Sequence, residues 1–502
     1  YAVARMEHDM DLFAPNSDGQ PYNLRVNHFN GEVTNPLYPL YKSKDNRHSR
    51  RWMGNYTANV EFTSWLNLDL TQTFEIENYR RELINPKDTW NTQGVYTNGS
   101  LRHESSETNT QNSQATLNFN NKFGDLILRG KLSYLYENRH YESTFVSASV
   151  FKVSEIEAFN NFESINSAGS SKTNEIAQNY FAILGLDFKD RYLLDGMFRY
   201  DGSSLFGPDA RWNPYYRLSA AYRISEDFQI NGVDELKLRV AHGTAGIRPD
   251  FSWQYQIFNL SQGNATKSQD GNRELKPSQT RETEIGLNIS FLKKFNFEAT
   301  YAQSNTTDQF LNVSLIPFLN GGYNSQWQNA GAIESKTIEM LFGADWIRTP
   351  KFSWNSNIVY GHRMVRTFEE MSAQLPEGSS INDYVINSEG YMIPAGTEGT
   401  RSELPILYQE NGETWLGKIG EGNANFNMGI ANTFDFNGLS LYVLLDWKNG
   451  GDVYNSNDQR LAFNNISKRQ DMTDVPDGEK KAASYWTVGM YDANFANEYW
   501  VE

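Results

Sequence analysis

The chain has 502 residues and a mass of 57.5 kDa, which is longer than the roughly 100–200 residues of one soluble domain and indicates several domains or one large closed sheet. A net charge of −16 with a pI near 5.0 argues against nucleic-acid binding, which depends on basic patches. Cysteine is absent, which excludes a small disulfide-stabilised fold, and no apolar run approaches the roughly 20 residues of a membrane-spanning helix.

Alternation of apolar and polar residues with period two predicts β-strands along most of the chain. Two early strands are expected at 56–62 and 68–76. Pairs of strands joined by very short turns follow at 115–119 with 126–136, 180–188 with 192–200, 283–291 with 295–301, 338–346 with 352–360, and 426–436 with 439–447. Together with single strands near 216–224 and 236–240, we expect about 16 strands.

Each strand has one apolar and one polar face. On 192–200, Tyr192 and Leu194 share the apolar face, whereas Asp195 and Arg199 lie on the other. Soluble sandwiches alternate in the same way, but their strands are typically about 5–6 residues long. The expected strands here approach the roughly 9–11 residues of a tilted bilayer crossing, and many begin or end in Tyr or Trp. The pattern therefore favours a membrane β-barrel, for which a mean hydropathy of −0.64 is no obstacle, because only alternate residues meet lipid.

The connections between strands are of two kinds. Tight turns alternate with long polar stretches, which we expect to be irregular loops at 77–113, 138–178, 243–280, 303–333, 362–425 and 448–485. Short periplasmic turns and long extracellular loops are typical of an outer-membrane barrel. The predicted fold is thus all-β, a large antiparallel transmembrane β-barrel in the bacterial outer membrane with its loops extracellular.

The ends of the chain predict a longer protein. The chain starts at Tyr1 rather than Met, and residues 498–502 have the pattern of a strand that has just begun. An open barrel edge in lipid leaves unpaired backbone groups that cost several kcal/mol each. We therefore expect further strands after residue 502 and further material before residue 1.

Enzyme signatures are absent from the sequence. It has no H-E-x-x-H, no P-loop, no dinucleotide-binding glycine motif and no G-x-S-x-G elbow, and its seven histidines are dispersed. His8 with Asp9 and Asp11 is a weak metal pattern, and the pair Glu369–Glu370 is expected by chance among 61 acidic residues. We predict no catalytic residues, no metal and no cofactor.

Four tryptophans in the expected loops are candidate substrate contacts: Trp90, Trp253, Trp327 and Trp415. An indole ring can stack on a sugar ring while its N–H forms a hydrogen bond. Packing between loops explains the same residues equally well, so both interpretations stay open.

One stretch is far more specific. Arg199-Tyr200-Asp201-Gly202-Ser203-Ser204-Leu205-Phe206-Gly207 follows a strand that starts Asp190-Arg191-Tyr192. Residues 236–246, residues 272–277 and Glu284-Ile285-Gly286-Leu287 form a second group. Together they resemble the barrel of the SusC/RagA family of TonB-linked outer-membrane transporters, convincingly over about residues 180–450. Tyr222 and Ser278 stand where that family usually has Trp and Glu.

Arg199, Asp201, Gly202, Ser203, Ser204 and Phe206 are interpreted as structural rather than substrate-binding residues. Asp201-Gly202 is expected to be a turn at which the strand bends, because glycine tolerates positive φ. Arg199 and Asp201 share the lumenal face and are expected to pair. Arg217, Arg239 and Glu284 are expected to line the lumen as well.

The resemblance implies a barrel of about 22 strands in the intact protein, of which residues 1–502 are a part without the N-terminal plug and the last strands. It implies import of a large nutrient, a glycan or peptide, with a SusD-like surface lipoprotein as lid and TonB as the energy source. The chain departs from the family at 418–423, where an acidic loop is usual, so no calcium is expected there. Two alternatives stay open: a structural or docking subunit of a larger surface or secretion assembly, and a soluble extracellular carbohydrate-active β-protein.

Overall fold

The computed structural model describes residues 37–87, 89–90, 96–154, 156–261, 263–329, 331–369 and 424–450, together with short segments at 11, 13–15, 384–386, 392–394, 405–410, 413–418, 468, 471–476 and 478–480. Within these residues a single antiparallel sheet of 14 strands forms the body of the protein. Its strands are β1 (Lys44–Thr63), β2 (Leu66–Asn85), β5 (Ser100–Phe123), β6 (Leu126–Phe151), β7 (Phe162–Phe188), β8 (Tyr192–Ser203), β9 (Trp212–Arg223), β10 (Val233–Ile247), β13 (Ser278–Phe291), β14 (Phe295–Thr307), β17 (Ala332–Arg348), β18 (Phe352–Glu369), β23 (Phe426–Phe436) and β24 (Leu439–Asn449).

The remaining elements are short. A second sheet contains β11 (Ile257–Ser261), β12 (Asn264–Asp270), β16 (Ser325–Asn329) and β15 (Phe310–Ser314), and three hairpins pair β3 (Thr89–Trp90) with β4 (Tyr96–Thr97), β19 (Tyr384–Ile386) with β20 (Met392–Pro394), and β21 (Pro405–Glu410) with β22 (Glu413–Lys418). The helices are α1 (Leu37–Lys42) and the 3₁₀ turns η2 (Phe159–Asn161), η3 (Pro208–Ala210), η4 (Ile224–Glu226) and η5 (Phe251–Gln254). None of the described helices combines the length and the hydropathy needed to cross a bilayer.

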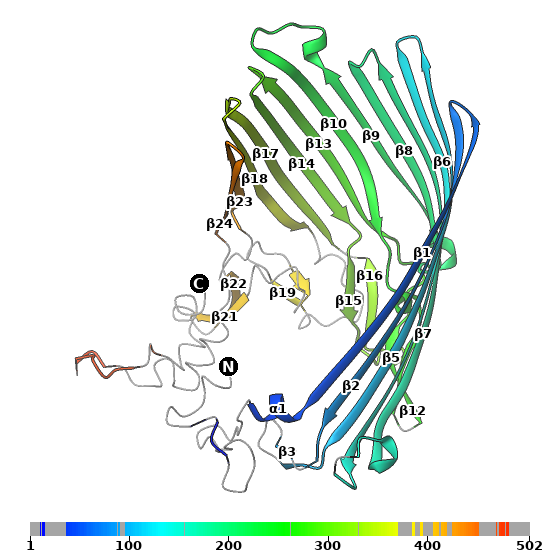
Figure 1. The fold of residues 1–502 in the computed structure, drawn as a ribbon. Coiled ribbons are helices and arrows are strands. Elements are labelled where there is room, and N and C mark those ends of the chain that lie inside the picture. The colour runs from blue at the N-terminus through cyan, green and yellow to red at the C-terminus, as the bar shows by residue number, and fades with distance from the viewer. Residues whose placement is uncertain are drawn as a thin grey trace.

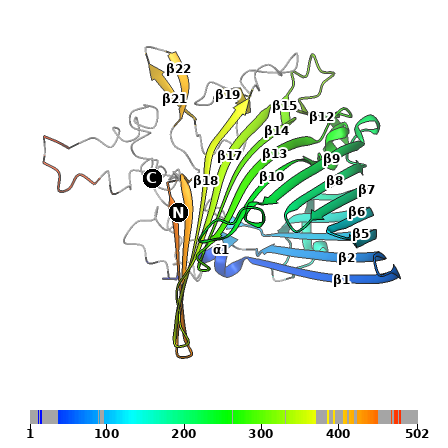
Figure 2. The same ribbon diagram turned by 90° about the horizontal axis from the view of Figure 1, so that it is seen from above.

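The main sheet is strongly curved, and its strands follow one another around it in sequence order (Figures 1 and 2). Within the described residues it does not close, and β1 and β24 form its two edges. The strand pairs expected from the sequence are all confirmed, although the main sheet has 14 strands where about 16 were expected over the whole chain.

Four of the expected irregular loops are wrong, because 243–280 and 303–333 contain the second sheet, and two others are largely parts of the main sheet. Residues 77–113 and 138–178 consist mostly of strand, because β2 continues to Asn85, β5 starts at Ser100, β6 continues to Phe151 and β7 starts at Phe162. β6 and β7 therefore reach 26 and 27 residues, instead of roughly the 9–11 of a bilayer crossing. The backbone ladder continues beyond the lipid, with one register shift between Ser147 and Ala148. No face of the strands is apolar there, so the period-two pattern ends before the strands do.

A small apolar core caps these extended strands at the long-loop end. Ile84, Leu101 and Phe151 are almost fully buried and pack with Phe159 and Phe162. Beside them the Asn161 amide donates to the carbonyl oxygens of Val153 and Ile156 at 2.7 and 2.8 Å, which closes the connection between β6 and β7. The extension thus has a core of its own outside the membrane.

Two belts of aromatic side chains bracket the convex face. The belt near the short turns includes Phe188, Tyr192, Tyr222, Phe295, Trp346, Trp354 and Phe434, and the belt near the loops includes Tyr134, Tyr180, Tyr200, Trp212, Tyr360, Phe426 and Trp447. Tyr192 and Tyr200 are eight residues apart on β8, or about 26 Å along the strand and about 20 Å across a bilayer at a tilt near 40°. Such a height is close to the apolar band of outer-membrane barrels, which is about 25 Å tall.

Polar partners hold the belts in place. The Trp354 indole N–H donates to Asn432 Oδ1 at 3.1 Å, and the Trp346 indole N–H donates to Ser356 Oγ at 2.9 Å. At the short-turn end, the Tyr192 hydroxyl donates to Asp227 at 2.8 Å. This hydrogen bond, with help from Tyr222 and Arg191, holds the pKa of Asp227 below its ordinary value.

The turn between β23 and β24 depends on glycine. Asn437 and Gly438 have φ of 49° and 91°, the pair of positive values that a two-residue hairpin turn requires. We expect Gly438→Ala to lower the free energy of unfolding by about 1 kcal/mol, because a Cβ disfavours positive φ. Urea unfolding of the full-length protein in detergent measures this change. Gly185→Ala in β7, where a Cβ meets only ordinary contacts at 3.8 Å, is the control and should change stability less.

Candidate functional site

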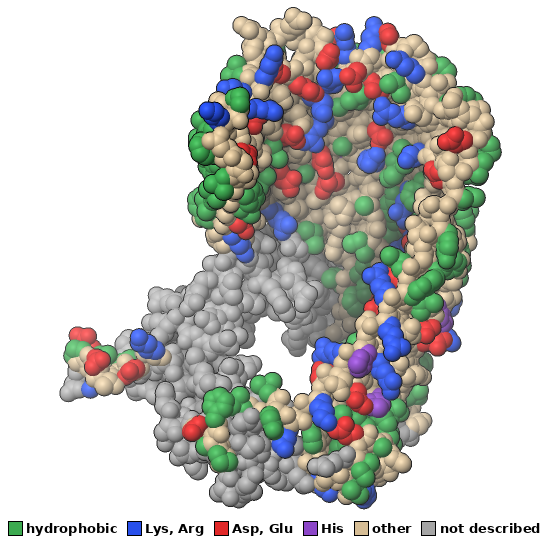
Figure 3. Space-filling view, viewed as in Figure 1, with side chains coloured by type: hydrophobic (Ala, Val, Ile, Leu, Met, Phe, Trp, Pro, Cys, Tyr) green, Lys and Arg blue, Asp and Glu red, His purple; other side chains and the backbone are tan. Residues whose placement is uncertain are grey.

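The concave face of the main sheet is polar and charged, in contrast to the convex face. Looking into it, Lys, Arg, Asp and Glu side chains gather over the half nearer the short turns, whereas hydrophobic side chains lie along the outer margins (Figure 3). The cross-strand register explains the separation, because Asp195, Ser219, Ala241 and Glu284 are paired along one row and the flanking rows point to the other side. A polar interior inside an apolar shell is the arrangement of a membrane barrel with a hydrated lumen.

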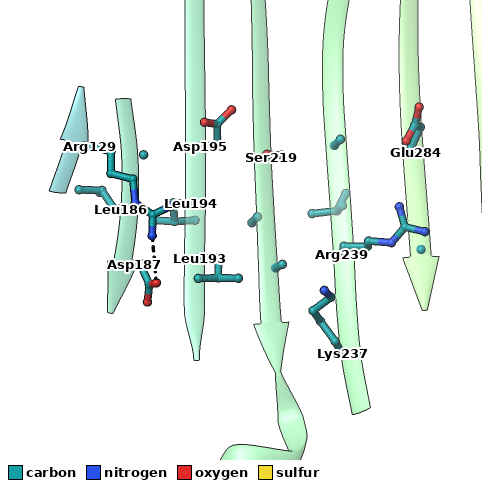
Figure 4. A pocket seen from close by; sticks show the side chains of 16 residues that line it. Arg129, Leu186, Asp187, Leu193, Leu194, Asp195, Ser219, Lys237, Arg239 and Glu284 are labelled. Carbon is teal, nitrogen blue, oxygen red and sulfur yellow. Dashed lines mark ion pairs between the residues drawn. The ribbon is translucent and has the colours of Figure 1, made fainter. Parts of the chain in front are cut away.

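A hollow with a volume of ≈ 400 Å³ lies on this face between β6 and β13. Figure 4 shows Arg129, Lys237 and Arg239 with Asp187 and Glu284 around it. Arg129 pairs with Asp187 at 3.5 Å, and the Arg239 guanidinium donates to Asn288 at 2.9 Å and to Thr300 at 2.7 Å. The hollow presents charges of both signs, which suits electrostatic recognition of a protein segment or polar ligand more than binding of an apolar molecule.

The neighbouring wall, formed by β13, β14 and β17, is acidic. Its lumenal positions include Glu282, Glu284, Glu298 and Glu339, and among the described residues none of these four carboxylates has an ion-pair partner. On β8 and β9, by contrast, Arg199 pairs with Asp201 and Arg217 with Asp195. The lumen is therefore electrically asymmetric, and its acidic wall favours cationic groups in whatever fills it.

Arg199 and Asp201, whose expected ion pair is present at 3.3 Å, belong to a larger cluster that we call the Arg248 network. Its members are Glu137, Asn179, Arg199, Asp201 and Arg248, from β6, β7, β8 and the segment after β10. Arg248 Nη2 lies 2.7 Å from Asp201 Oδ1 and 3.3 Å from Glu137 Oε2, and Asn179 donates to Glu137 at 2.7 Å. The Asp201 side chain is 8% exposed and Asn179 is fully buried, so their contacts are largely shielded from water, whereas the Glu137 side chain is 36% exposed. Arg248 was not predicted, since nothing in the sequence links it to β8.

Gly202 corrects one expectation. It does not form a turn and does not have positive φ, but lies within β8 beside Trp212. A Cβ on Gly202 would sit 2.6 Å from the Trp212 ring. Glycine is thus required here by the close approach of an indole across the strand pair and not by a bend of the backbone.

The residues after Gly202 tie the sheet to the loops. The Ser204 backbone donates to the Ile176 carbonyl and the Ser204 hydroxyl accepts from the Ile176 N–H, both at 2.9 Å. Ser203 Oγ accepts from Leu205 N at 3.2 Å, and the side chain of Phe206 is 2% exposed. The structural role of the six sequence-selected residues stays a prediction, which variants of the neighbouring Arg248 and Gly207 test below.

Two of the four candidate tryptophans meet, one from the small sheet and one from the turn η5. Trp253 on η5 and Trp327 on β16 stack with ring centroids 3.8 Å apart and an interplanar angle of 12°. Trp253 also packs edge-to-face with Phe310, with ring centroids 5.1 Å apart. Packing between loops therefore accounts for one face of each ring. Trp90 and Trp415 lie on β3 and β22, whose side chains are outside the described part of the chain.

We expect Trp327→Ala to loosen the small sheet, because it removes half of this stack and leaves Trp253 in contact with Phe310 alone. The loss should be about 2 kcal/mol, below that of a fully buried Trp, since both residues are only partly buried. Faster protease cleavage within residues 308–331 of the full-length protein measures it. Phe318→Ala in the same connection, where the side chain is 93% exposed, should leave the cleavage rate unchanged.

No group of three or more His, Cys, Asp or Glu side chains able to hold a metal occurs in the described segments. His8 and Asp9 lie outside them, as does the stretch 419–423 at which calcium was not expected. The absence of a metal therefore stays a prediction for both places.

The aromatic belts, the apolar convex face and the polar lumenal wall define an integral outer-membrane β-barrel. The chain belongs to the family described as "TonB dependent receptor-like, beta-barrel", whose model matches residues 9–500. The family resemblance seen in the sequence is thereby confirmed.

Similar proteins agree with this assignment. TonB-dependent receptor P39 of Formosa agariphila is 24% identical over 519 residues, covering 88% of this chain and 49% of that protein. TonB-dependent receptor SusC of Bacteroides thetaiotaomicron is 25% identical over 58% of this chain and 28% of its own length. The structure of the RagAB peptide transporter superposes with a TM-score of 0.72 at 14% identity, over 89% of this chain and 53% of that one, which shows a common fold. The chain spans about half the length of the curated relatives that it matches along most of its length.

Proposed function

We propose that this chain is the barrel portion of an outer-membrane importer that takes up a large nutrient, a glycan or a peptide, and is energised through TonB. The observation that carries the proposal is the charged, hydrogen-bonding concave wall enclosed by a lipid-facing shell (Figure 3). A wall of this kind offers hydrogen bonds and charges to polar cargo as it crosses the membrane, which lipid tails cannot do. A plug supplied by the rest of the protein would fill the lumen until TonB acts, and its basic groups would meet the acidic wall of β13, β14 and β17.

We further propose that the short turns face the periplasm and the long-loop end faces the medium. The asymmetry between two-residue turns such as Asn437-Gly438 and the extended, capped strands β5, β6 and β7 supports this orientation. A surface lipoprotein of the SusD type is the partner we propose for the loop end. Similarity to SusC and to the RagAB peptide transporter supports this choice. The chain performs no chemical step on its cargo on this view and needs no cofactor.

Uptake by intact cells tests the proposal. A strain lacking the full-length protein is compared with its parent for uptake of labelled oligosaccharides and labelled oligopeptides, with a TonB-deficient strain as the energy control. Loss of uptake of one cargo class in both mutant strains supports import. Undiminished uptake of every cargo, together with co-purification of the barrel with secretion or adhesion components and without a SusD-like lipoprotein, would replace import by the docking-subunit alternative.

A further inference from the structure

The lipid-facing wall carries an apolar groove in the region of β5 to β10. Two adjoining hollows with volumes of ≈ 740 and ≈ 460 Å³ share Leu184, Gly196 and Leu218. The outward-facing side chains that line them are almost entirely aliphatic or aromatic, and the strand backbone beneath is paired in the ladder. The backbone groups beneath the groove are therefore already hydrogen-bonded, and they leave no unpaired polar group that would bind water.

The groove exists because small and large residues alternate along the cross-strand rows. The register places Gly130, Leu184, Gly196 and Leu218 in one row, so that two positions without side chains alternate with two large ones. On β8 itself, Gly196 lies between Leu194 and Phe198. The large residues around it project outward, with exposed fractions of 50% for Leu184, 52% for Leu194, 50% for Phe198 and 60% for Leu218. The floor of the groove is thus backbone, and its rim is four large apolar side chains.

The depth of the groove limits what can occupy it. Gly196 is four residues from Tyr192 of the short-turn belt and four residues from Tyr200 of the loop belt, so it lies at the centre of the hydrocarbon layer. At that depth the surrounding molecules are lipid tails. If the groove is empty, the dispersion contacts that a fitted acyl chain would make are lost. Dispersion attraction between packed surfaces is what stabilises association inside a membrane.

One end of the groove is polar. It reaches His242, whose Nε2 is 3.2 Å from the Tyr216 hydroxyl and whose Nδ1 is 2.8 Å from Thr283 Oγ1. This cluster lies on the long-loop side of Gly196, whereas the opposite end of the same hollow is formed by Leu186 and Leu194. A lipid has its ester and hydroxyl groups at one end of its chains, so the polar cluster fixes the direction in which it enters.

We propose that this groove is a binding site for one acyl chain of a lipid from the leaflet on the long-loop side, with the polar end of that chain at Tyr216, His242 and Thr283. The chain lies over Gly196 and is held between Leu184 and Leu218. The site depends on the position of the barrel in the membrane and not on import. The lipid-site proposal therefore holds whichever cargo the protein carries.

A photoreactive phospholipid tests the site. The full-length protein is placed in lipid nanodiscs that contain a phospholipid with a diazirine halfway along one acyl chain, and the sites of covalent labelling are mapped by mass spectrometry. Labelling of Leu184, Gly196 and Leu218 should exceed that of Leu287 and Met340, which face lipid at β13 and β17 outside the groove, by about fivefold, the ratio expected for a preference near 1 kcal/mol.

Gly196→Leu fills the groove and should bring its labelling down to the level of the reference surface. Ala299→Leu places a leucine on the lipid-facing side of β14, outside the groove, and should leave labelling of the groove unchanged. Leu218→Ala removes one rim residue without adding bulk and should also reduce labelling, which keeps the test decisive if Gly196→Leu does not fold. Equal labelling of the groove and the reference surface in the native protein, or groove labelling that survives both Gly196→Leu and Leu218→Ala, would overturn the proposal.

Discussion

Arg248→Met is expected to lower the free energy of unfolding by about 2–3 kcal/mol, because it removes the guanidinium that neutralises Asp201 and Glu137 in a largely shielded position. The loss should be smaller than that of a fully buried ion pair, since the Arg248 side chain is 25% exposed and Asp201 keeps Arg199 at 3.3 Å. Urea titration of the full-length protein in detergent, followed by tryptophan fluorescence, measures the change.

The matched control is Arg217→Met. Arg217 also pairs with an aspartate on β8, Asp195, but their side chains are 51% and 36% exposed, and the change should cost at most about 1 kcal/mol. Removal of both charges in Arg248→Met with Asp201→Asn should restore part of the stability, because no buried carboxylate is then left with Arg199 as its only cationic partner. Equal losses for Arg248→Met and Arg217→Met would contradict a structural role of the network.

The positions of the strands could be predicted wherever one face meets lipid. Tyr192, Leu194 and Phe198 are apolar because the bilayer requires it, and this period-two pattern located β8 and its neighbours correctly. Above the lipid that requirement ends. In β6 the residues from Asn138 onward are held by the same backbone ladder, yet their side chains on both faces are mostly polar, so the sequence pattern resembles that of a loop.

The candidate site was predictable only in part, because some of its contacts come from segments without a period-two pattern. Family resemblance located Arg199 and Asp201, and alternation placed them on one face. Their strongest partner, Arg248, comes from a connection 47 residues beyond Asp201 that period-two patterns do not describe. The meaning of Gly202 was likewise set by Trp212 on the adjacent strand, a contact that depends on register and not on local turn chemistry.

Gly207→Ala is expected to prevent normal assembly of the junction between β8 and the loops. A Cβ at this position would overlap the carbonyl oxygen of Arg273 and lie 2.9 Å from its carbonyl carbon, and these are backbone atoms that cannot rotate away. The flanking side chains of Phe206 and Leu275 are 2% and 1% exposed, so neither segment can move apart without opening a packed contact. We expect a loss of about 3 kcal/mol or more.

The measurement is the fraction of full-length protein in the outer membrane that resists unfolding in sodium dodecyl sulfate without heating. Gly361→Ala in β18 is the matched control, because it adds the same methyl group where no atom lies within 4 Å and φ is not positive, and it should leave that fraction unchanged. The comparison separates two explanations of the Ser203-Ser204-Leu205-Phe206-Gly207 sequence. If Gly207→Ala folds normally but uptake falls, the stretch serves the cargo path. If folding and uptake fall together while Gly361→Ala behaves as the native protein, the stretch is a structural joint through which β8 fixes the loops.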